Sequence, residues 1–302
     1  MTNNELIEKI KRLKEEKDAV ILAHYYVDGE VQAIADYVGD SFYLAKVATK
    51  IDKKVIVFCG VMFMGESAKI LNPEKTVLLP DATADCPMAH MAQIDRIKEL
   101  RAQYDDLAVV CYVNSTAELK MHSDICVTSS NALEIVESIP NKNIFFIPDQ
   151  NLGGFIKDKV KDKNIILNDG YCHVHHELTK ESVLKAMEEH KDAAFLVHPE
   201  CRKEIVDLAE YAGSTAGIID YATKSDKKEF IIGTELGVMY ELQVKNPDKK
   251  FYPVYEKLLC PNMKKITLES VVDALENMKY EVELTEEVID KANAPLKRML
   301  EY

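Results

Sequence analysis

The stretch IILNDGYCHVHHE, residues 165–177, joins an apolar run to a loop rich in metal-binding side chains. The apolar run ends at the turn sequence NDG, and Cys172 then stands among three histidines. A strand that runs into such a loop is a common place for catalytic and binding residues. Cys86 lies 86 residues before Cys172, and Cys260 lies 88 residues after it. Near-equal spacing of three cysteines predicts an internal repeat.

Polar motifs recur with the same period. HYY (24–26) is followed by GDS (39–41), CYVN (111–114) by SSN (129–131), and VHPE (197–200) by GST (213–215). In each pair a hydroxyl residue stands 15 positions after the end of the first motif: Tyr26 and Ser41, Asn114 and Ser129, Glu200 and Thr215. We therefore predict three copies of one α/β unit, at 1–84, 85–171 and 172–267.

Near-continuous apolar runs alternate with helical patterns along the chain. The predicted strands are 19–26, 55–63, 76–81, 107–113, 125–130, 144–149, 193–200 and 229–235. Helices are expected between them, among others at 31–38 and 201–212, and the helical tail 268–302 is expected to pack on the first unit. Continuous apolar strands alternating with helices are typical of parallel α/β folds.

The charge balance favours a protein that handles small molecules. The net charge of −13 argues against nucleic acid or an anionic membrane as a partner, since both need basic surface. No apolar signal segment is evident, and the longest apolar runs fall short of the roughly 20 residues that span a bilayer. Seven widely spaced cysteines fit a reduced, cytoplasmic protein.

Ligands of parallel sheets bind beyond the carboxyl ends of the strands. Side chains of the following residues are predicted at such ends: His24, Tyr26, Tyr112, Asn114, His198 and Glu200. Ser41, Ser129, Ser214 and Thr215 are predicted at helix starts, which favour anions. Any one of these could simply cap a helix or complete a hydrogen bond. Because different reactive side chains recur at the same strand end, we expect one pocket for a small anionic substrate.

Three of the cysteines differ from the rest in their surroundings. Cys86, Cys172 and Cys260 stand in loop-like sequence, and three thiolates on one axis predict a metal site. Zinc with an open position and an iron–sulfur cluster are both compatible with this set, since HVHH also offers nitrogen ligands. The other cysteines lie in or beside apolar runs and are expected to be small buried hydrophobes: Cys59, Cys111, Cys126 and Cys201.

The chain resembles the quinolinate synthase family over essentially its whole length. The resemblance rests on these motifs, in the family's order: HYY (24–26), GDS (39–41), ADCPMAH (84–90), YVNS (112–115), TSSNA (128–132), DGYCHVH (169–175), HPEC (198–201), GSTAGI (213–218) and CPNM (260–263). It implies three homologous three-layer α/β/α domains around a pseudo-threefold axis, with the active site at the centre.

The resemblance also implies the chemistry. It implies a 4Fe-4S cluster held by Cys86, Cys172 and Cys260, with one open iron. The implied transferase reaction condenses iminosuccinate with dihydroxyacetone phosphate to quinolinate, phosphate and water in NAD biosynthesis. Transient contact with the enzyme that produces iminosuccinate is a further expectation. Some family members carry a CxxCxxC motif near the C-terminus, whereas Pro261 follows Cys260 here, so thiol–disulfide regulation at that motif is not expected.

Roles within the expected pocket follow from the implied reaction. Tyr26 and Glu200 are candidates for proton transfer, with His198 as a partner and His175 as a weaker one. Tyr112 is a candidate for both catalysis and binding. His198 and Glu200 are also candidates for substrate binding. The remaining residues would bind the dicarboxylate or the phosphate: His24, Ser41, Asn114, Ser129, Ser214 and Thr215.

Two other classes of function compete with this interpretation. One is a zinc-dependent lyase or hydrolase built on HVHH and Cys172. The other is a non-catalytic protein that closes on a small anion, which would not need three convergent thiols.

Overall fold

The computed structural model describes residues 1–302 and contains three four-stranded sheets, all of them parallel. Each sheet has the same strand order, in which the first strand pairs with both the second and the third. In spatial order, the first sheet consists of β2 (Tyr37–Gly39), β1 (Ala19–His24), β3 (Val55–Cys59) and β4 (Thr76–Leu78). The second consists of β6 (Ile125–Val127), β5 (Leu107–Tyr112), β7 (Asn143–Ile147) and β8 (Asn164–Leu167). The third consists of β10 (Tyr211–Ala212), β9 (Ala194–Val197), β11 (Glu229–Gly233) and β12 (Lys250–Pro253). The predicted parallel α/β fold with three similar units is confirmed.

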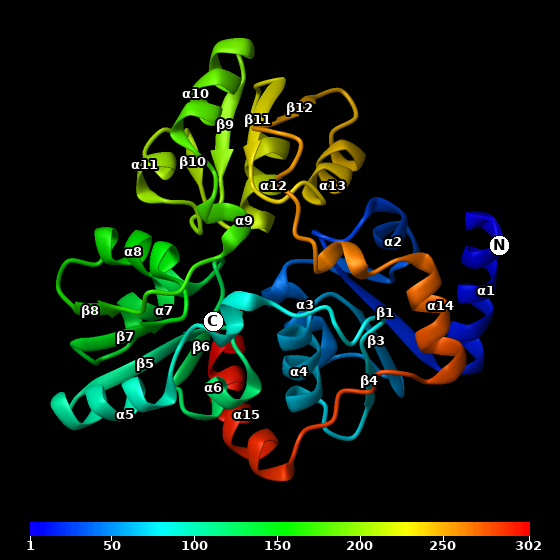
Figure 1. Cartoon of the computed structure of the whole chain (residues 1–302), viewed down its shortest axis with the longest axis horizontal. Helices are drawn as coiled ribbons and strands as arrows, with labels where there is room; N and C mark the ends of the chain where they lie inside the picture. The colour runs from blue at the N-terminus through cyan, green and yellow to red at the C-terminus, as the bar shows by residue number, and fades with distance from the viewer.

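The sheets form three lobes that meet at the centre of the molecule (Figure 1). The helices of the first lobe are α1 (Asn3–Glu16), α2 (Gly29–Ile34), α3 (Ser41–Ala48) and α4 (Met62–Leu71). Those of the second are η1 (Pro87–His90), α5 (Ile94–Gln103), α6 (Ala117–Met121), α7 (Ala132–Ser138) and α8 (Gln150–Lys159). Those of the third are α9 (His173–His176), α10 (Lys180–Glu189), α11 (Lys203–Val206), α12 (Thr215–Lys224), α13 (Val238–Lys245) and η2 (Met263–Lys265).

The chain ends in two helices that return to the first two lobes. α14 (Leu268–Asn277) packs on α1, and α15 (Glu286–Leu300) packs on α4 of the first lobe and on α6 and β6 of the second (Figure 1). The tail therefore bridges two lobes. The unit boundaries given above stay predictions. No helix combines the length and the apolar character needed to cross a membrane.

Two predicted helices are wrong in part, because each gives way to a short edge strand. The segment predicted as a helix over 31–38 stops at Ile34 and continues as β2, and that over 201–212 contains only α11 before β10. These strands have three and two residues, too few to display a strand's alternation in sequence. The edge strand β12 was not predicted at all, since its residues are only partly buried.

Buried side chains cover both faces of the sheet in the third lobe. Phe195, Val197 and Ile231 pack into a core on one face of its sheet, whereas Leu196 and Ile232 pack into a second core on the other. This alternation is that of strands covered on both faces. The first two lobes and the tail instead share one continuous core. The third lobe thus has two cores separate from that of the other lobes, and Tyr25 of the first lobe packs into one of them.

Candidate active site

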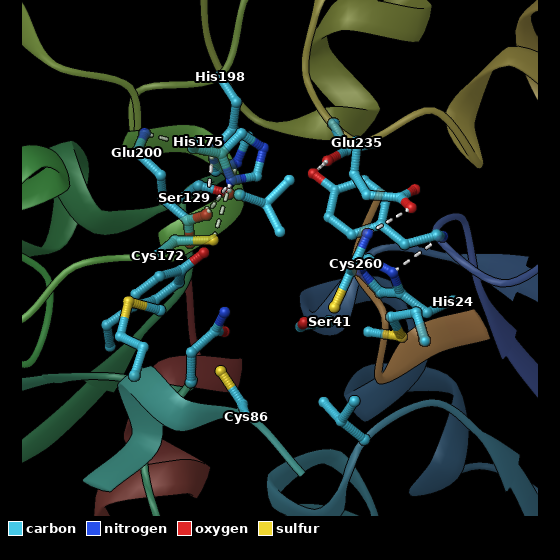
Figure 2. Close-up of a pocket in the computed structure, with 18 of the residues that line it drawn as sticks. His24, Ser41, Cys86, Ser129, Cys172, His175, His198, Glu200, Glu235 and Cys260 are labelled. Atoms are coloured by element: carbon cyan, nitrogen blue, oxygen red, sulfur yellow. Dashed lines mark hydrogen bonds and ion pairs between the residues drawn. The ribbon is translucent and has the colours of Figure 1, made fainter. Parts of the chain in front are cut away.

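A cavity lies where the carboxyl ends of the three sheets meet, and its empty space, including the part open to solvent, is about 780 Å³. Figure 2 shows side chains from all three lobes pointing into it. Every predicted site residue lines this cavity except Ser214: His24, Tyr26, Ser41, Cys86, Tyr112, Asn114, Ser129, Cys172, His175, His198, Glu200, Thr215 and Cys260. The segment at the carboxyl end of the first strand of each sheet supplies two of them, because the repeat places equivalent residues at equivalent strand ends.

His24 and His198 are equivalent residues with the same backbone contact. The Nδ1 atom of His24 accepts the backbone N–H of Tyr26 at 3.1 Å, and that of His198 accepts the backbone N–H of Glu200 at 3.3 Å. Burial lowers the pKa of His24 to about 3 and that of His198 to about 4, so both rings are neutral at pH 7. A neutral ring that accepts at Nδ1 carries its proton on Nε2. For His198 this atom lies 3.2 Å from the hydroxyl of Ser129.

A chain of hydrogen bonds joins candidate catalytic residues of the first and third lobes. The hydroxyl of Tyr26 lies 2.8 Å from the hydroxyls of both Thr215 and Thr234. The Thr234 hydroxyl is also 2.9 Å from Nε2 of His175, whose Nδ1 is 2.7 Å from a carboxylate oxygen of Glu200. Thr234 is fully buried and outside the cavity lining, so it fixes two lining side chains from behind.

The charges of these groups are set by burial and by their neighbours. Burial raises the pKa of Tyr26 and of Tyr112 well above the usual value, so both keep their phenolic protons. Burial also works against ionisation of Glu200, but the imidazoles of His175 and His198 more than offset it and lower the pKa of Glu200. The cavity therefore presents the protonated hydroxyls of Tyr26 and Tyr112 and the neutral imidazoles of His24 and His198 beside the ionised carboxylate of Glu200.

Two residues that line the cavity each have a buried polar atom without a partner. These atoms are Oδ1 of Asn114 and Oε1 of Glu200, which stand at equivalent places beyond β5 and β9. A buried polar oxygen without a hydrogen bond is costly. Two of them at equivalent positions in one cavity indicate a ligand with donor groups.

The three predicted cysteines come from three loops and point into the same cavity (Figure 2). Each follows the last strand of its sheet: Cys86 follows β4, Cys172 follows β8, and Cys260 follows β12. All three are free and only partly buried. Burial raises the pKa of Cys86 to about 12 and also raises that of the other two thiols, so a bound cation would be needed to hold them as thiolates.

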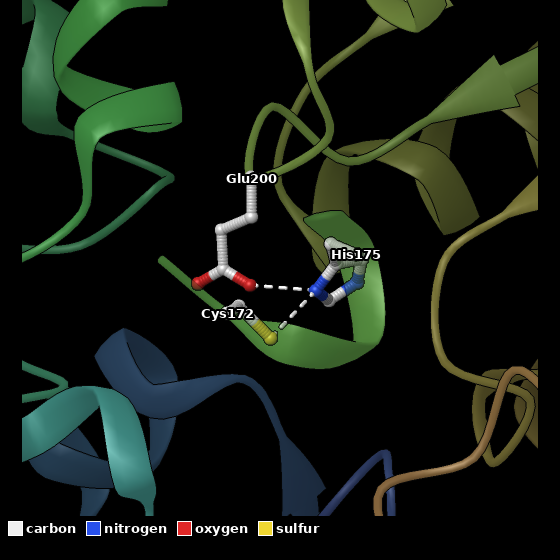
Figure 3. Close-up of side chains that lie close together, drawn as sticks. All are labelled: Cys172, His175 and Glu200. Carbon is white, nitrogen blue, oxygen red and sulfur yellow. Dashed lines mark hydrogen bonds and ion pairs between the residues drawn. The ribbon is translucent and has the colours of Figure 1, made fainter. Parts of the chain in front are cut away.

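Only one set of side chains is close enough to hold a single ion, and it differs from the cysteine triad. Ligand atoms of Cys172, His175 and Glu200 lie within 4.8 Å of one another (Figure 3). All of their contacts run through Nδ1 of His175, which is 3.2 Å from the Cys172 sulfur and 2.7 Å from Glu200. One ring nitrogen of His175 thus contacts both neighbours, while the second carboxylate oxygen of Glu200 has no partner.

The helix starts differ in detail from the predicted hydroxyl caps. Asp40 caps α3 by accepting the backbone N–H of Tyr43, which leaves Ser41 as the first helical residue and free to face the cavity. Ser214 is the only predicted hydroxyl that caps its helix, α12, and it turns away from the cavity while Thr215 lines it. The substrate-binding role predicted for Ser214 therefore gains no support from its position. The four cysteines expected to be inert are all fully buried.

Several residues of the site were missed in the sequence. Thr234 and Glu235 follow β11 directly, and Asp149 follows β7 at the place equivalent to Glu235. All three are fully buried. The period of 86 residues that separates 149 from 235 was the signal that could have found the two acids.

Comparison with known proteins gives one consistent result. Residues 8–301 match the model of a family described as quinolinate synthetase A protein. The chain is 56% identical to the quinolinate synthase of Fusobacterium nucleatum, over 97% of this chain and 98% of the relative. It is 54% identical to the quinolinate synthase of Caldicellulosiruptor saccharolyticus, over 98% and 99% of the two chains. It is 50% identical to quinolinate synthase 2 of Methanosarcina acetivorans, over 99% and 96%.

Proposed function

The chain belongs to the quinolinate synthetase A family, and on that premise we propose that it condenses iminosuccinate with dihydroxyacetone phosphate. The products would be quinolinate, phosphate and water, in the biosynthesis of NAD. The observation that carries this proposal is the cavity, where three cysteines and three pairs of strand-end side chains meet. The similarity to these relatives extends over nearly the whole length of both chains. Transient contact with the enzyme that supplies iminosuccinate stays a prediction.

The cysteine triad suits a 4Fe-4S cluster better than one zinc ion. Three thiolates on one tetrahedral zinc lie about 3.8 Å apart, given Zn–S bonds of about 2.3 Å. The sulfurs of Cys86, Cys172 and Cys260 do not all lie within 4.8 Å of one another, which supports ligands of separate irons. When bound, such a cluster would supply a Lewis acid, since three cysteines leave one iron open to substrate.

Anion binding falls to donors at equivalent places in the three lobes. We assign this role to Nε2–H of His24 and His198 and to the hydroxyl of Tyr112, which end β1, β9 and β5. Their neutral state keeps all three as donors across the physiological pH range. The carboxylates of iminosuccinate and the phosphate of the second substrate need such donors. Hydroxyls that line the cavity would add to them: Ser41, Ser129 and Thr215.

Proton transfer falls to Glu200 and Tyr26. Glu200 is ionised and keeps one oxygen without a partner, so it can accept a proton from bound substrate. Tyr26 keeps its proton and can donate it to a leaving oxygen, with Thr215 and Thr234 holding its hydroxyl in place. His175 would orient Glu200 through its 2.7 Å contact, and His198 would support it from 3.7 Å.

The proposal is tested by product analysis under anaerobic conditions. Cluster-loaded protein supplied with iminosuccinate and dihydroxyacetone phosphate should form quinolinate and release one phosphate per turnover. Cys172→Ser is the matched inactive control, whereas Cys201→Ser, which alters a cysteine outside the cavity, should keep activity. Cluster-loaded wild-type protein that forms no quinolinate would contradict the proposal.

A further inference from the structure

The three cysteine loops share a backbone contact that repeats with the units. In each lobe, the backbone N–H of a residue just past the third strand donates to the carbonyl oxygen two positions before the cysteine. The pairs are Met62 to Ala84 at 2.8 Å, Gln150 to Gly170 at 2.7 Å and Leu236 to Leu258 at 3.0 Å. Because these bonds are equivalent, the residues just before the three donors also occupy equivalent positions in the three lobes: Val61, Asp149 and Glu235. Two of the three equivalent positions therefore carry a carboxylate next to a cysteine loop.

The two carboxylate oxygens of Asp149 accept hydrogen bonds from different segments, one from a helix and one from a cysteine. One oxygen accepts the backbone N–H of Leu152 at 2.7 Å and so caps α8. The other accepts the backbone N–H of Cys172 at 3.2 Å. The residue is fully buried, although an aspartate is rarely found in that state.

Glu235 divides its oxygens in the same way. One accepts the backbone N–H of Gly237 at 2.6 Å, at the start of α13, and the other accepts the backbone N–H of Cys260 at 3.0 Å. It is also fully buried, and Lys264 pairs with it at 3.2 Å. The Lys264 ammonium donates in turn to the carbonyl oxygen of Tyr26 at 2.8 Å, which ties this arrangement to the first lobe.

The first lobe lacks the buried carboxylate. Val61 stands at its place, and the backbone N–H of Cys86 is bonded at 2.8 Å by Asp85, its immediate neighbour, whose side chain is 44% exposed. All three cysteines thus have their peptide N–H bonded to a carboxylate. Only in the second and third lobes does that carboxylate reach from a rigid strand end.

We propose that Asp149 and Glu235 are positioning residues that hold Cys172 and Cys260 in the direction needed to bind a cluster. A bond to the peptide N–H fixes the peptide plane before the cysteine and hence the direction of its Cα–Cβ bond. Groups behind metal ligands act in this way in many metal sites. Both oxygens of each carboxylate accept N–H groups, so an amide side chain cannot replace it: its NH2 group would face one of the donors. This inference rests on the proposed function, since it concerns the cluster site of that enzyme.

The test compares Asp149→Asn and Glu235→Gln with the wild type after anaerobic reconstitution of the full chain. The readouts are the rate of iron release to excess chelator and the thermal unfolding temperature of the metal-free protein. We expect iron release about 10- to 100-fold faster in each variant, the size of effect seen for groups behind metal ligands. Thr179→Ala is the matched control, because it removes the side-chain cap of α10 and leaves the backbone N–H groups of the cysteines bonded.

The outcomes separate the possible failures. The positioning role is supported if Asp149→Asn or Glu235→Gln releases iron faster than the wild type. The control Thr179→Ala should then release iron at the wild-type rate, although its unfolding temperature falls by a similar amount. Release at the wild-type rate in a folded variant overturns it, and each variant suffices for this if the other does not fold. Wild-type protein that takes up no cluster contradicts the proposed function itself and the inference with it.

Discussion

Replacing Thr234 by Val should slow catalysis without weakening substrate binding. The hydroxyl of Thr234 bonds both Tyr26 and His175, at 2.8 and 2.9 Å, yet it does not line the cavity. Valine has nearly the same shape, so the substitution removes these bonds and little else. It leaves Tyr26 with its bond to Thr215 and leaves Nε2 of His175 buried without a partner.

The size of the effect follows from the two lost bonds. If each bond holds its side chain in the reactive orientation by about 1 kcal/mol, each loss lowers the reactive population about fivefold. Loss of both lowers kcat about 30-fold, while KM changes little. The free energy of unfolding should fall by roughly 2 to 4 kcal/mol, since one buried imidazole nitrogen stays unsatisfied.

The assay is anaerobic steady-state quinolinate formation by Thr234→Val with its iron content matched to the wild type. Ser123→Ala is the control, because it removes a buried hydroxyl bonded to the carbonyl oxygen of Leu119, away from the cavity. The control should lose about 1 kcal/mol of stability and keep wild-type kcat. A kcat of Thr234→Val within twofold of the wild type would refute the role given to this hydroxyl.

Three other predictions concern the cavity and a contact between two lobes. Tyr26→Phe and Glu200→Gln should each lower turnover by about 10²-fold or more at unchanged iron content, and near-wild-type turnover would remove that residue from proton transfer. Burial lowers the pKa of the His24 imidazole to about 3. Between pH 6.5 and 3 this imidazole is therefore protonated in the unfolded chain and neutral in the folded chain. The stability of the metal-free protein should therefore fall as the pH drops through this window, by up to about 5 kcal/mol from this residue, and urea unfolding of His24→Gln should show a shallower fall. A Cβ atom on Gly237 would lie 2.6 Å from the carbonyl oxygen of Tyr25. Gly237→Ala should therefore lower the free energy of unfolding, measured in urea, by about 1 to 3 kcal/mol. An unchanged urea midpoint would contradict this close contact between lobes.

The threefold arrangement could be predicted from the sequence because candidate functional residues recur once in each structural unit. Cys86, Cys172 and Cys260 recur at nearly equal spacing, and polar residues recur at strand ends that long apolar runs make recognisable. Apolar runs predicted the central strands well, since β1, β3, β5 and β9 are buried along their whole length.

The edge strands were harder to predict because they are short and half-exposed. The residues of β2 and β10 follow helical segments closely, so the apolar pattern runs on without a break. The repeat contains the missing information: β6 begins at Ile125, and the periods of 88 and 86 place the equivalent strands at Tyr37 and Tyr211. The same reasoning links β8 at Asn164 to β12 at Lys250.

The contacts behind the cavity could not be predicted from residue types alone. Thr234, Asp149 and Glu235 act through partners distant in sequence. Thr234 carries no pattern of its own, and the 86-residue period marks the two acids as equivalent without revealing their contacts. Only the positions of several loops in space bring them to the cysteines and to Tyr26.

We propose above that the three lobes hold one iron–sulfur cluster at their common cavity. The direct test is iron and sulfide analysis of anaerobically purified protein together with its visible absorption spectrum. We predict about four irons and four sulfides per chain, lost in Cys86→Ser, Cys172→Ser or Cys260→Ser and kept in Cys59→Ser, whose sulfur is buried in the first sheet. A colourless protein that carries a single zinc ion would contradict the account.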